Sequence, residues 1–178
     1  MKDLKRSQID PMPDYFGRYI NLVPDTTLGD AMAASLRHID ELDPELLERI
    51  GLRVYQPGKW TVNSVIQHIT DFERIFGYRA LVYARGAGIT PQGIDEQILA
   101  ANSNADSRSI REVVAELRSA RVSTIDMFAG FDDRMLSIQG RIWNEEMSVL
   151  AMGFNMIGHQ IHHFGVIAER YFPLANQS

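Results

Sequence analysis

Gly158-His159-Gln160-Ile161-His162-His163-Phe164 lies inside a long apolar run, residues 149–172, and it guides the interpretation of the whole sequence. Three of the chain's five histidines fall within five consecutive positions of this stretch. Residues four apart lie one above the other on a helix, so His159 and His163 are predicted to share one face. Two imidazoles at this spacing can bind one divalent metal ion, or each can hydrogen-bond a neighbour and fill the core. The pair alone does not decide between these interpretations.

Composition limits the classes of protein to which the chain can belong. The 178 residues are 45% hydrophobic and 23% charged, which is typical of a soluble globular protein, and we predict a single domain over 1–178. The net charge of −5, without a basic block, argues against nucleic acid as a partner. Neither a membrane span nor the apolar core of a signal peptide is predicted. Cysteine is absent, which excludes disulfides and thiolate ligands, and we expect a cytoplasmic protein.

Hydrophobic periodicity predicts four long helices, with Thr27, Thr61 and Ser109 as caps at the starts of the first three. The four expected ranges are 28–42, 62–85, 109–129 and 148–172. A short helix is predicted from Pro44, closed by Gly51.

The segments between the helices carry the remaining predictions. Residues 86–106 form a long connection between the second and third helices, with a helical turn or two at 95–101. Residues 137–144 are predicted to be an extended turn or a small hairpin, and Pro173 is predicted to end the fourth helix. Residues 1–26 contain three prolines between aromatic residues and are predicted to be an irregular segment packed on the body.

Four long helices joined by loops favour an all-α fold, a four-helix bundle, and bundles commonly build metal sites between facing helices. On the second helix, His68 lies on an inward stripe with Val65 and Phe72. Together with His159 and His163 it would give three neutral ligands and an open coordination position, which is typical of catalytic metal sites. We therefore predict a divalent metal ion at these three histidines. Zinc or nickel is favoured, with iron or manganese as alternatives.

Three further residues are candidates to support this site. His162 lies about 100° around the helix from each neighbouring residue, so it is predicted to orient a ligand or to pack at an interface. Asp71 and Glu73 are the carboxylates nearest to His68 in sequence. Either could orient an imidazole or act as a base, or both could be solvated charges. His38 is predicted to be a surface histidine.

Several motifs resemble those of the DinB-like (DinB/YfiT) superfamily, and the resemblance extends over most of the chain. They are Pro-Gly-Lys-Trp-Thr at 57–61, His-Ile-Thr-Asp-Phe-Glu-Arg at 68–74 and Gly-His-Gln-Ile-His-His at 158–163. The resemblance implies a four-helix bundle, often a homodimer. It also implies a metal held by one histidine of the second helix and two of the last, here His68, His159 and His163. Its better understood members are metal-dependent hydrolases or thiol-dependent transferases.

Two classes of function follow. The favoured one is a metal-dependent hydrolase or thiol S-transferase that acts on a small molecule, in the second case with a low-molecular-weight thiol. Arg74, Arg79 and Arg85 are candidates to bind carboxylates of such a thiol, or they are surface charges. The alternative is a non-catalytic, metal-binding dimeric bundle that binds a small ligand. The fourth helix is apolar on more faces than one neighbour can cover, which predicts a twofold homodimer.

Overall fold

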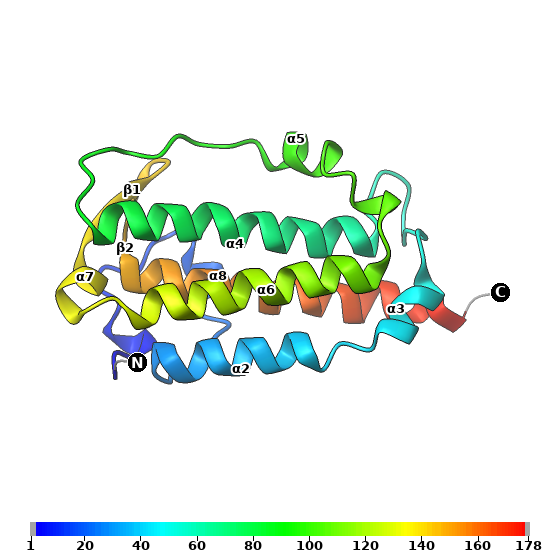
Figure 1. Ribbon diagram of the computed structural model, residues 1–178, viewed down its shortest axis with the longest axis horizontal. Coiled ribbons are helices and arrows are strands. Elements are labelled where there is room, and N and C mark those ends of the chain that lie inside the picture. The colour runs from blue at the N-terminus through cyan, green and yellow to red at the C-terminus, as the bar shows by residue number, and fades with distance from the viewer. Residues whose placement is uncertain (1–2, 177–178) are drawn as a thin grey trace.

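The structure is a computed structural model that describes residues 3–176. Within these residues, four long helices lie beside one another along the length of the molecule (Figure 1). They are α2 (Leu28–Asp40), α4 (Val62–Ala84), α6 (Ile110–Ala129) and α8 (Val149–Val166). Both α2 and α4 pack against α6 and against α8. The predicted all-α four-helix bundle is confirmed.

Shorter elements lie at the ends and along the sides of the bundle (Figure 1). An antiparallel hairpin pairs β1 with β2 from Gln139 opposite Ser148 to Ile142 opposite Glu145. The connection that contains α5 runs along the outer side of α4 (Figure 1). The short helices and strands are α1 (Gly17–Ile20), α3 (Pro44–Ile50), α5 (Glu96–Ala101), α7 (Asp133–Ser137), β1 (Gln139–Ile142) and β2 (Glu145–Ser148), and 3₁₀ turns are found at Arg6–Gln8 and Ala105–Ser107.

Each long helix begins at a side chain that accepts a hydrogen bond from an otherwise unpaired backbone amide. Thr61 accepts from the amide of Ser64, and Ser109 exchanges bonds with Glu112 in a capping box. Thr27 and Ser148 cap α2 and α8 in the same way. Because this chemistry is local, the starts of all four helices agree with the prediction from sequence.

Helix α8 is the most deeply buried element of the bundle. Every residue from Val149 to Gln160 is buried, and α8 contacts α1, α2 and α4. Part of this cover comes from the N-terminal segment, because the backbone of α1 lies directly on α8. A Cβ atom at Gly158 would lie 2.0 Å from the carbonyl oxygen of Tyr19, so only glycine permits this approach.

Two apolar clusters fill the bundle, one toward each end. Phe76 and Phe154 belong to the first, and Ile66 and Leu117 to the second. Between them, at mid-height, lies a layer of buried polar side chains, which we call the polar layer. Its members are Ser35, His68, Glu73, Arg121, His159 and Gln160. Polar groups in such a place require partners, since unpaired burial costs free energy.

The best-buried ion pair of the polar layer joins two of the long helices. Arg121 of α6 donates from Nη2 to Glu73 Oε2 of α4 at 2.8 Å, and both residues are at most 1% exposed. Arg121 Nη1 also donates to Ser35 Oγ of α2 at 2.6 Å. Its Nη2 also reaches the carbonyl oxygen of Met156 in α8 at 3.5 Å, so one guanidinium links all four long helices.

The end of the fourth helix differs from the prediction. The α-helical pattern stops at Val166, a π turn follows at Ile167–Tyr171, and a 3₁₀ segment covers Phe172–Asn176. Pro173 lies inside that last segment and does not end the helical path. Proline lacks an amide hydrogen, but near the start of a helical segment that amide has no partner to lose.

The segment before α8 also holds more structure than was predicted. The extended turn or small hairpin expected at 137–144 is a hairpin whose second strand reaches Ser148, and α7 precedes it. Asp132 caps α7 by accepting from the amide of Met135. Trp143 occupies the turn of the hairpin with a φ of 55°, a conformation that bulky residues seldom adopt.

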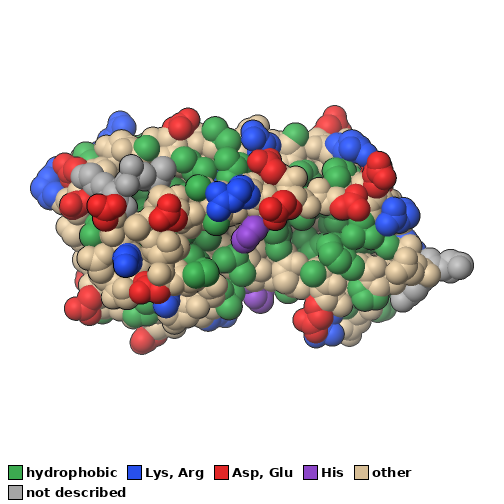
Figure 2. All heavy atoms as spheres, turned by 90° about the horizontal axis from the view of Figure 1, so that it is seen from below, with side chains coloured by type: hydrophobic (Ala, Val, Ile, Leu, Met, Phe, Trp, Pro, Cys, Tyr) green, Lys and Arg blue, Asp and Glu red, His purple; other side chains and the backbone are tan. Residues whose placement is uncertain are grey.

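The surface carries mixed charge. On the face shown in Figure 2, acidic and basic side chains are interspersed with hydrophobic ones, and neither sign forms a broad region. His38 is exposed, as predicted. Among residues 3–176 we find no helix with the length and apolar character that crossing a membrane requires.

Candidate metal centre

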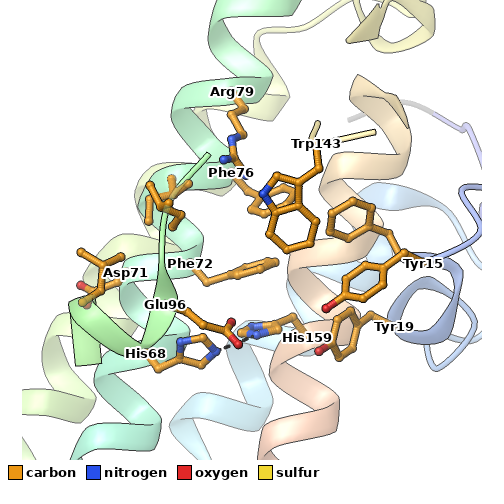
Figure 3. A pocket seen from close by; sticks show the side chains of 14 residues that line it. Tyr15, Tyr19, His68, Asp71, Phe72, Phe76, Arg79, Glu96, Trp143 and His159 are labelled. Carbon is orange, nitrogen blue, oxygen red and sulfur yellow. Dashed lines mark hydrogen bonds between the residues drawn. The ribbon is translucent and has the colours of Figure 1, made fainter. Parts of the chain in front are cut away.

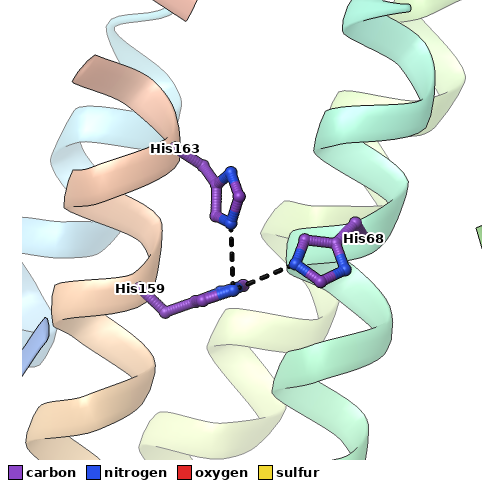
Figure 4. A group of neighbouring side chains, drawn as sticks. All are labelled: His68, His159 and His163. Carbon is purple, nitrogen blue, oxygen red and sulfur yellow. Dashed lines mark hydrogen bonds between the residues drawn. The ribbon is translucent and has the colours of Figure 1, made fainter. Parts of the chain in front are cut away.

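His68, His159 and His163 meet at the polar layer, between α4 and α8 (Figure 4). The Nε2 atom of His159 lies 3.0 Å from Nε2 of His68 and 3.0 Å from Nε2 of His163. One nitrogen of each ring lies within 4.8 Å of the others. The three histidines predicted from sequence are thus brought together, with the same ring atom pointing to a common region.

This geometry suits a bound cation better than a hydrogen-bonded cluster. A neutral imidazole nitrogen carries either one proton or one lone pair, so His159 Nε2 cannot form two well-directed hydrogen bonds at once. Three nitrogens that bind zinc at 2.0–2.1 Å in tetrahedral geometry lie about 3.3 Å apart, close to the two 3.0 Å separations at His159. Small movements of the rings would therefore produce a three-histidine metal site.

Packing fixes the orientation of the rings. Phe72, one turn after His68 on α4, stacks on His159 with centroids 3.7 Å apart and planes 11° from parallel. Trp60 lies against His68 with centroids 5.0 Å apart, and the edge of Tyr19 meets His159 at 5.3 Å. Aromatic rings hold the cluster on several sides and reduce its access to water.

All three imidazoles are neutral at neutral pH. Burial lowers the pKa of His68 to about 4. Burial, followed by the effect of the neighbouring imidazoles of His68 and His162, lowers the pKa of His163 to about 3. Burial first, and then the nearby histidines and the charge of Arg121, hold the pKa of His159 well below 6.5. Metal ligation requires neutral imidazole, so the fold prepares the ligands without a metal.

The metal-free protein is expected to lose stability as the pH falls below 6.5. In the unfolded chain a histidine takes up its proton near pH 6.5, whereas His68 in the folded chain stays neutral down to about pH 4. The folded state therefore binds fewer protons in this window, and the free energy of unfolding decreases as the pH falls. For His68 alone the decrease is about 2 kcal/mol between pH 7.5 and 5.

Urea unfolding in the presence of chelator at these two pH values measures the effect. His68→Leu should reduce the difference between the two pH values, and His38→Ala, on the surface, should leave it unchanged. A His68→Leu variant with the wild-type pH dependence would contradict the prediction.

The three supporting candidates are found in different environments. Glu73 faces away from the imidazoles and pairs with Arg121. Asp71 accepts a hydrogen bond from Gln67 Nε2 at 3.0 Å, and burial raises the pKa of its carboxyl. His162 is exposed, and its ring contacts the edges of Tyr19 at 5.4 Å and His163 at 5.0 Å.

A narrow pocket opens beside the histidines (Figure 3). His68 and His159 lie at one end of it and Arg79 at the other, with Phe72 and Phe76 of α4 between them (Figure 3). The opposite wall comes from other elements: Tyr15 and Tyr19 of the N-terminal segment, Trp143 of the hairpin, and Ile94, Glu96 and Leu99 of the long connection. The pocket has an apolar middle and polar ends.

Sequence reasoning missed several of these pocket residues. Glu96 follows the N-cap of α5, and its carboxylate points toward His68 and His159 in Figure 3. Nothing in the local sequence distinguishes Glu96 from an ordinary first-turn acid. The one available signal was the length of the connection at 86–106, because connections of this length often carry function. No sequence pattern indicated that Trp143 would reach the pocket, because its position depends on the conformation of the hairpin turn.

Comparison with known proteins supports the fold and the family. A protein-family model described as the DinB superfamily matches residues 27–167. The solved structure of YfiT from Bacillus subtilis matches with a TM-score of 0.63 and 16% sequence identity, over 86% of this chain and 84% of that one. That protein is described as a probable metal-dependent hydrolase with an unusual four-helix bundle topology. No curated protein matches this sequence.

Proposed function

This chain belongs to the DinB superfamily, and on that premise we propose that it is a divalent-metal-dependent enzyme, a hydrolase or thiol S-transferase that acts on a small molecule. His68, His159 and His163 would hold the metal ion. Zinc or nickel suits three imidazoles, and iron or manganese is the alternative. When bound, such an ion lowers the pKa of a water or thiol ligand and so supplies a nucleophile near neutral pH.

The observation that carries this proposal is that three neutral imidazoles converge and that two of them, His68 and His159, line a pocket. A structural zinc site closes all four positions with protein ligands, whereas three ligands leave room for water or substrate. The residues around the site have separate tasks. Phe72 stacks on His159 and excludes water from one side. Burial raises the pKa of Tyr19, so its hydroxyl stays protonated near the centre and can donate a hydrogen bond.

The two reactions differ in what the pocket must bind. Hydrolysis needs only water beside the substrate, whereas thiol transfer needs a second, usually anionic, small molecule. Of the three arginines considered from sequence, Arg79 alone lines the pocket beside the histidines. Arg74 forms an ion pair with Glu116, and Arg85 is exposed. A cation in the pocket is compatible with both reactions, so experiment must separate them.

Metal analysis of the purified protein, followed by two assays, tests the proposal. We expect about one divalent ion per chain at a three-ligand site. Turnover of activated esters without thiol would identify a hydrolase, and conjugation of an electrophile only when a low-molecular-weight thiol is present would identify a transferase. Stoichiometric metal without turnover in either assay would favour the non-catalytic, ligand-binding alternative. His163→Ala, measured in parallel, separates metal-dependent turnover from background.

Homodimerisation and a cytoplasmic location stay predictions. The dimer was predicted because the fourth helix is apolar on most of its faces. In the structure, the N-terminal segment of the same chain covers part of that apolar surface. Exposed apolar side chains remain on α5, where Ile98 is 62% exposed. Sedimentation at micromolar protein concentration determines the oligomeric state.

A further inference from the structure

Arg79 is a buried cation without an acidic partner. The residue is 3% exposed, yet no carboxylate in residues 3–176 forms an ion pair with it. Its Nη2 donates to the carbonyl oxygen of Gln92 at 3.1 Å, and its guanidinium lies 5.0 Å from the centre of the Phe76 ring. A guanidinium has five N–H donors, so these contacts use only part of its capacity.

Comparison with Arg121 shows what is unusual about Arg79. Arg121 is 0% exposed and is bound to the carboxylate of Glu73, as a buried charge requires. Arg79 is buried to nearly the same degree, but within residues 3–176 its guanidinium contacts the Gln92 carbonyl and the Phe76 ring and pairs with no carboxylate. Burial without a counter-ion costs free energy. An anion that enters the pocket would recover that cost.

Arg79 and His68 lie at opposite ends of the pocket and project from the same face of α4. Both His68 and Arg79 lie on α4, eleven residues apart, which corresponds to a rise of about 16 Å and a net rotation of about 20°. They therefore project from the same face of one helix. Phe72 and Phe76 occupy that face between them and stack with centroids 4.2 Å apart, and Trp143 covers them from the other side (Figure 3).

We propose that Arg79 binds the anionic end of the substrate, and that the substrate is an elongated organic anion with an apolar middle. Its carboxylate would lie at Arg79, its apolar part along Phe72 and Phe76, and its reacting group at the histidines. Arg79 is a binding residue that sets orientation and distance. This inference deepens the proposed function, since it rests on the histidines as the reacting end.

Isothermal titration calorimetry with 6-phenylhexanoate and its uncharged amide tests the role of Arg79. Both compounds are titrated into the full chain, once with zinc bound and once with chelator. We expect the acid to bind wild-type protein about tenfold more tightly than the amide, because charge-assisted hydrogen bonds are the stronger ones. The preference should be the same with and without zinc, since the guanidinium, and not the metal, holds the carboxylate.

Two substitutions on α4 separate charge from structure. Arg79→Gln can still donate to the Gln92 carbonyl but has no charge, and it should bind acid and amide equally. Arg85→Gln, exposed on the same helix, should keep the wild-type preference. Arg79→Lys keeps the charge but lacks the planar guanidinium group, so it should prefer the acid over the amide less strongly than wild type does. This variant tests the anion site if Arg79→Gln does not fold.

The outcomes distinguish this inference from the proposed function. A wild-type protein without preference for the acid, or variants at Arg79 that all keep the full preference, would overturn the anion site. A preference seen only with zinc would also overturn the anion site, because the carboxylate would then bind the metal ion and not Arg79. That result would leave the proposed metal centre supported. A protein that binds no metal but shows the Arg79-dependent preference would support the anion site and overturn the proposed function.

Discussion

Replacing His159 by alanine is expected to abolish tight divalent-metal binding. His159 provides the nitrogen that lies 3.0 Å from both other ring nitrogens, so its loss leaves only two ligands. Loss of a residue that only orients a ligand lowers metal affinity by about 10–100-fold, and loss of a ligand should cost more than that. Competition of zinc between the protein and a fluorescent chelator at pH 7.5 measures the change.

Two controls accompany this measurement. His38→Ala removes an exposed histidine and should leave the affinity unchanged. His163→Ala removes a less buried ligand and should also abolish tight binding, which separates loss of ligation from any packing defect at His159. Wild-type zinc affinity in folded His159→Ala protein would show that the three histidines are not the metal site.

Removing Arg121 is expected to have the largest effect on stability. Arg121→Ala would leave Glu73 as an unpaired charge in the core and would break the hydrogen bond to Ser35. Breaking a buried pair at one partner costs about 3–5 kcal/mol, a large share of the stability of a domain of this size. Urea unfolding at pH 7.5 should show this loss as a lower midpoint.

Arg118 offers a matched control on the same helix. It pairs with Asp40 at 2.7 Å, but both side chains are about half exposed, so Arg118→Ala should leave the urea midpoint nearly unchanged. Replacing both partners, Arg121→Met with Glu73→Leu, should be less destabilising than either single change, because no charge is left unpaired. Equal losses for Arg118→Ala and Arg121→Ala would refute the role assigned to the pair.

The parts of the structure that follow from local chemistry could be predicted from sequence. The cap at Thr61 and the capping box at Ser109 fixed the starts of two helices, because these hydrogen bonds join residues three apart. The spacing of His159 and His163 placed two rings on one face. His68 then followed from its inward position on the facing helix, and the three nitrogens do converge.

The remaining parts depend on contacts between distant residues. Glu73 was considered as a neighbour of the histidines, but its partner is Arg121, and only the packing of α4 against α6 shows this. Glu96 and Trp143 reach the pocket through a long connection and a hairpin turn, which sequence patterns do not position. The π turn at Ile167–Tyr171 has no sequence signal that we recognise.

The central position of α8 has a consequence for how the protein is made. The other three long helices precede α8 in the chain, and α8 supplies two of the three clustered histidines. At a ribosomal rate of about 5–20 residues per second, roughly 2–7 s separate the synthesis of Ala129 from that of Val166. During that interval the apolar faces of α2, α4 and α6 have no central helix to cover them. The nascent chain must therefore stay partly open until its last long helix is inserted, and only then can the three histidines come together.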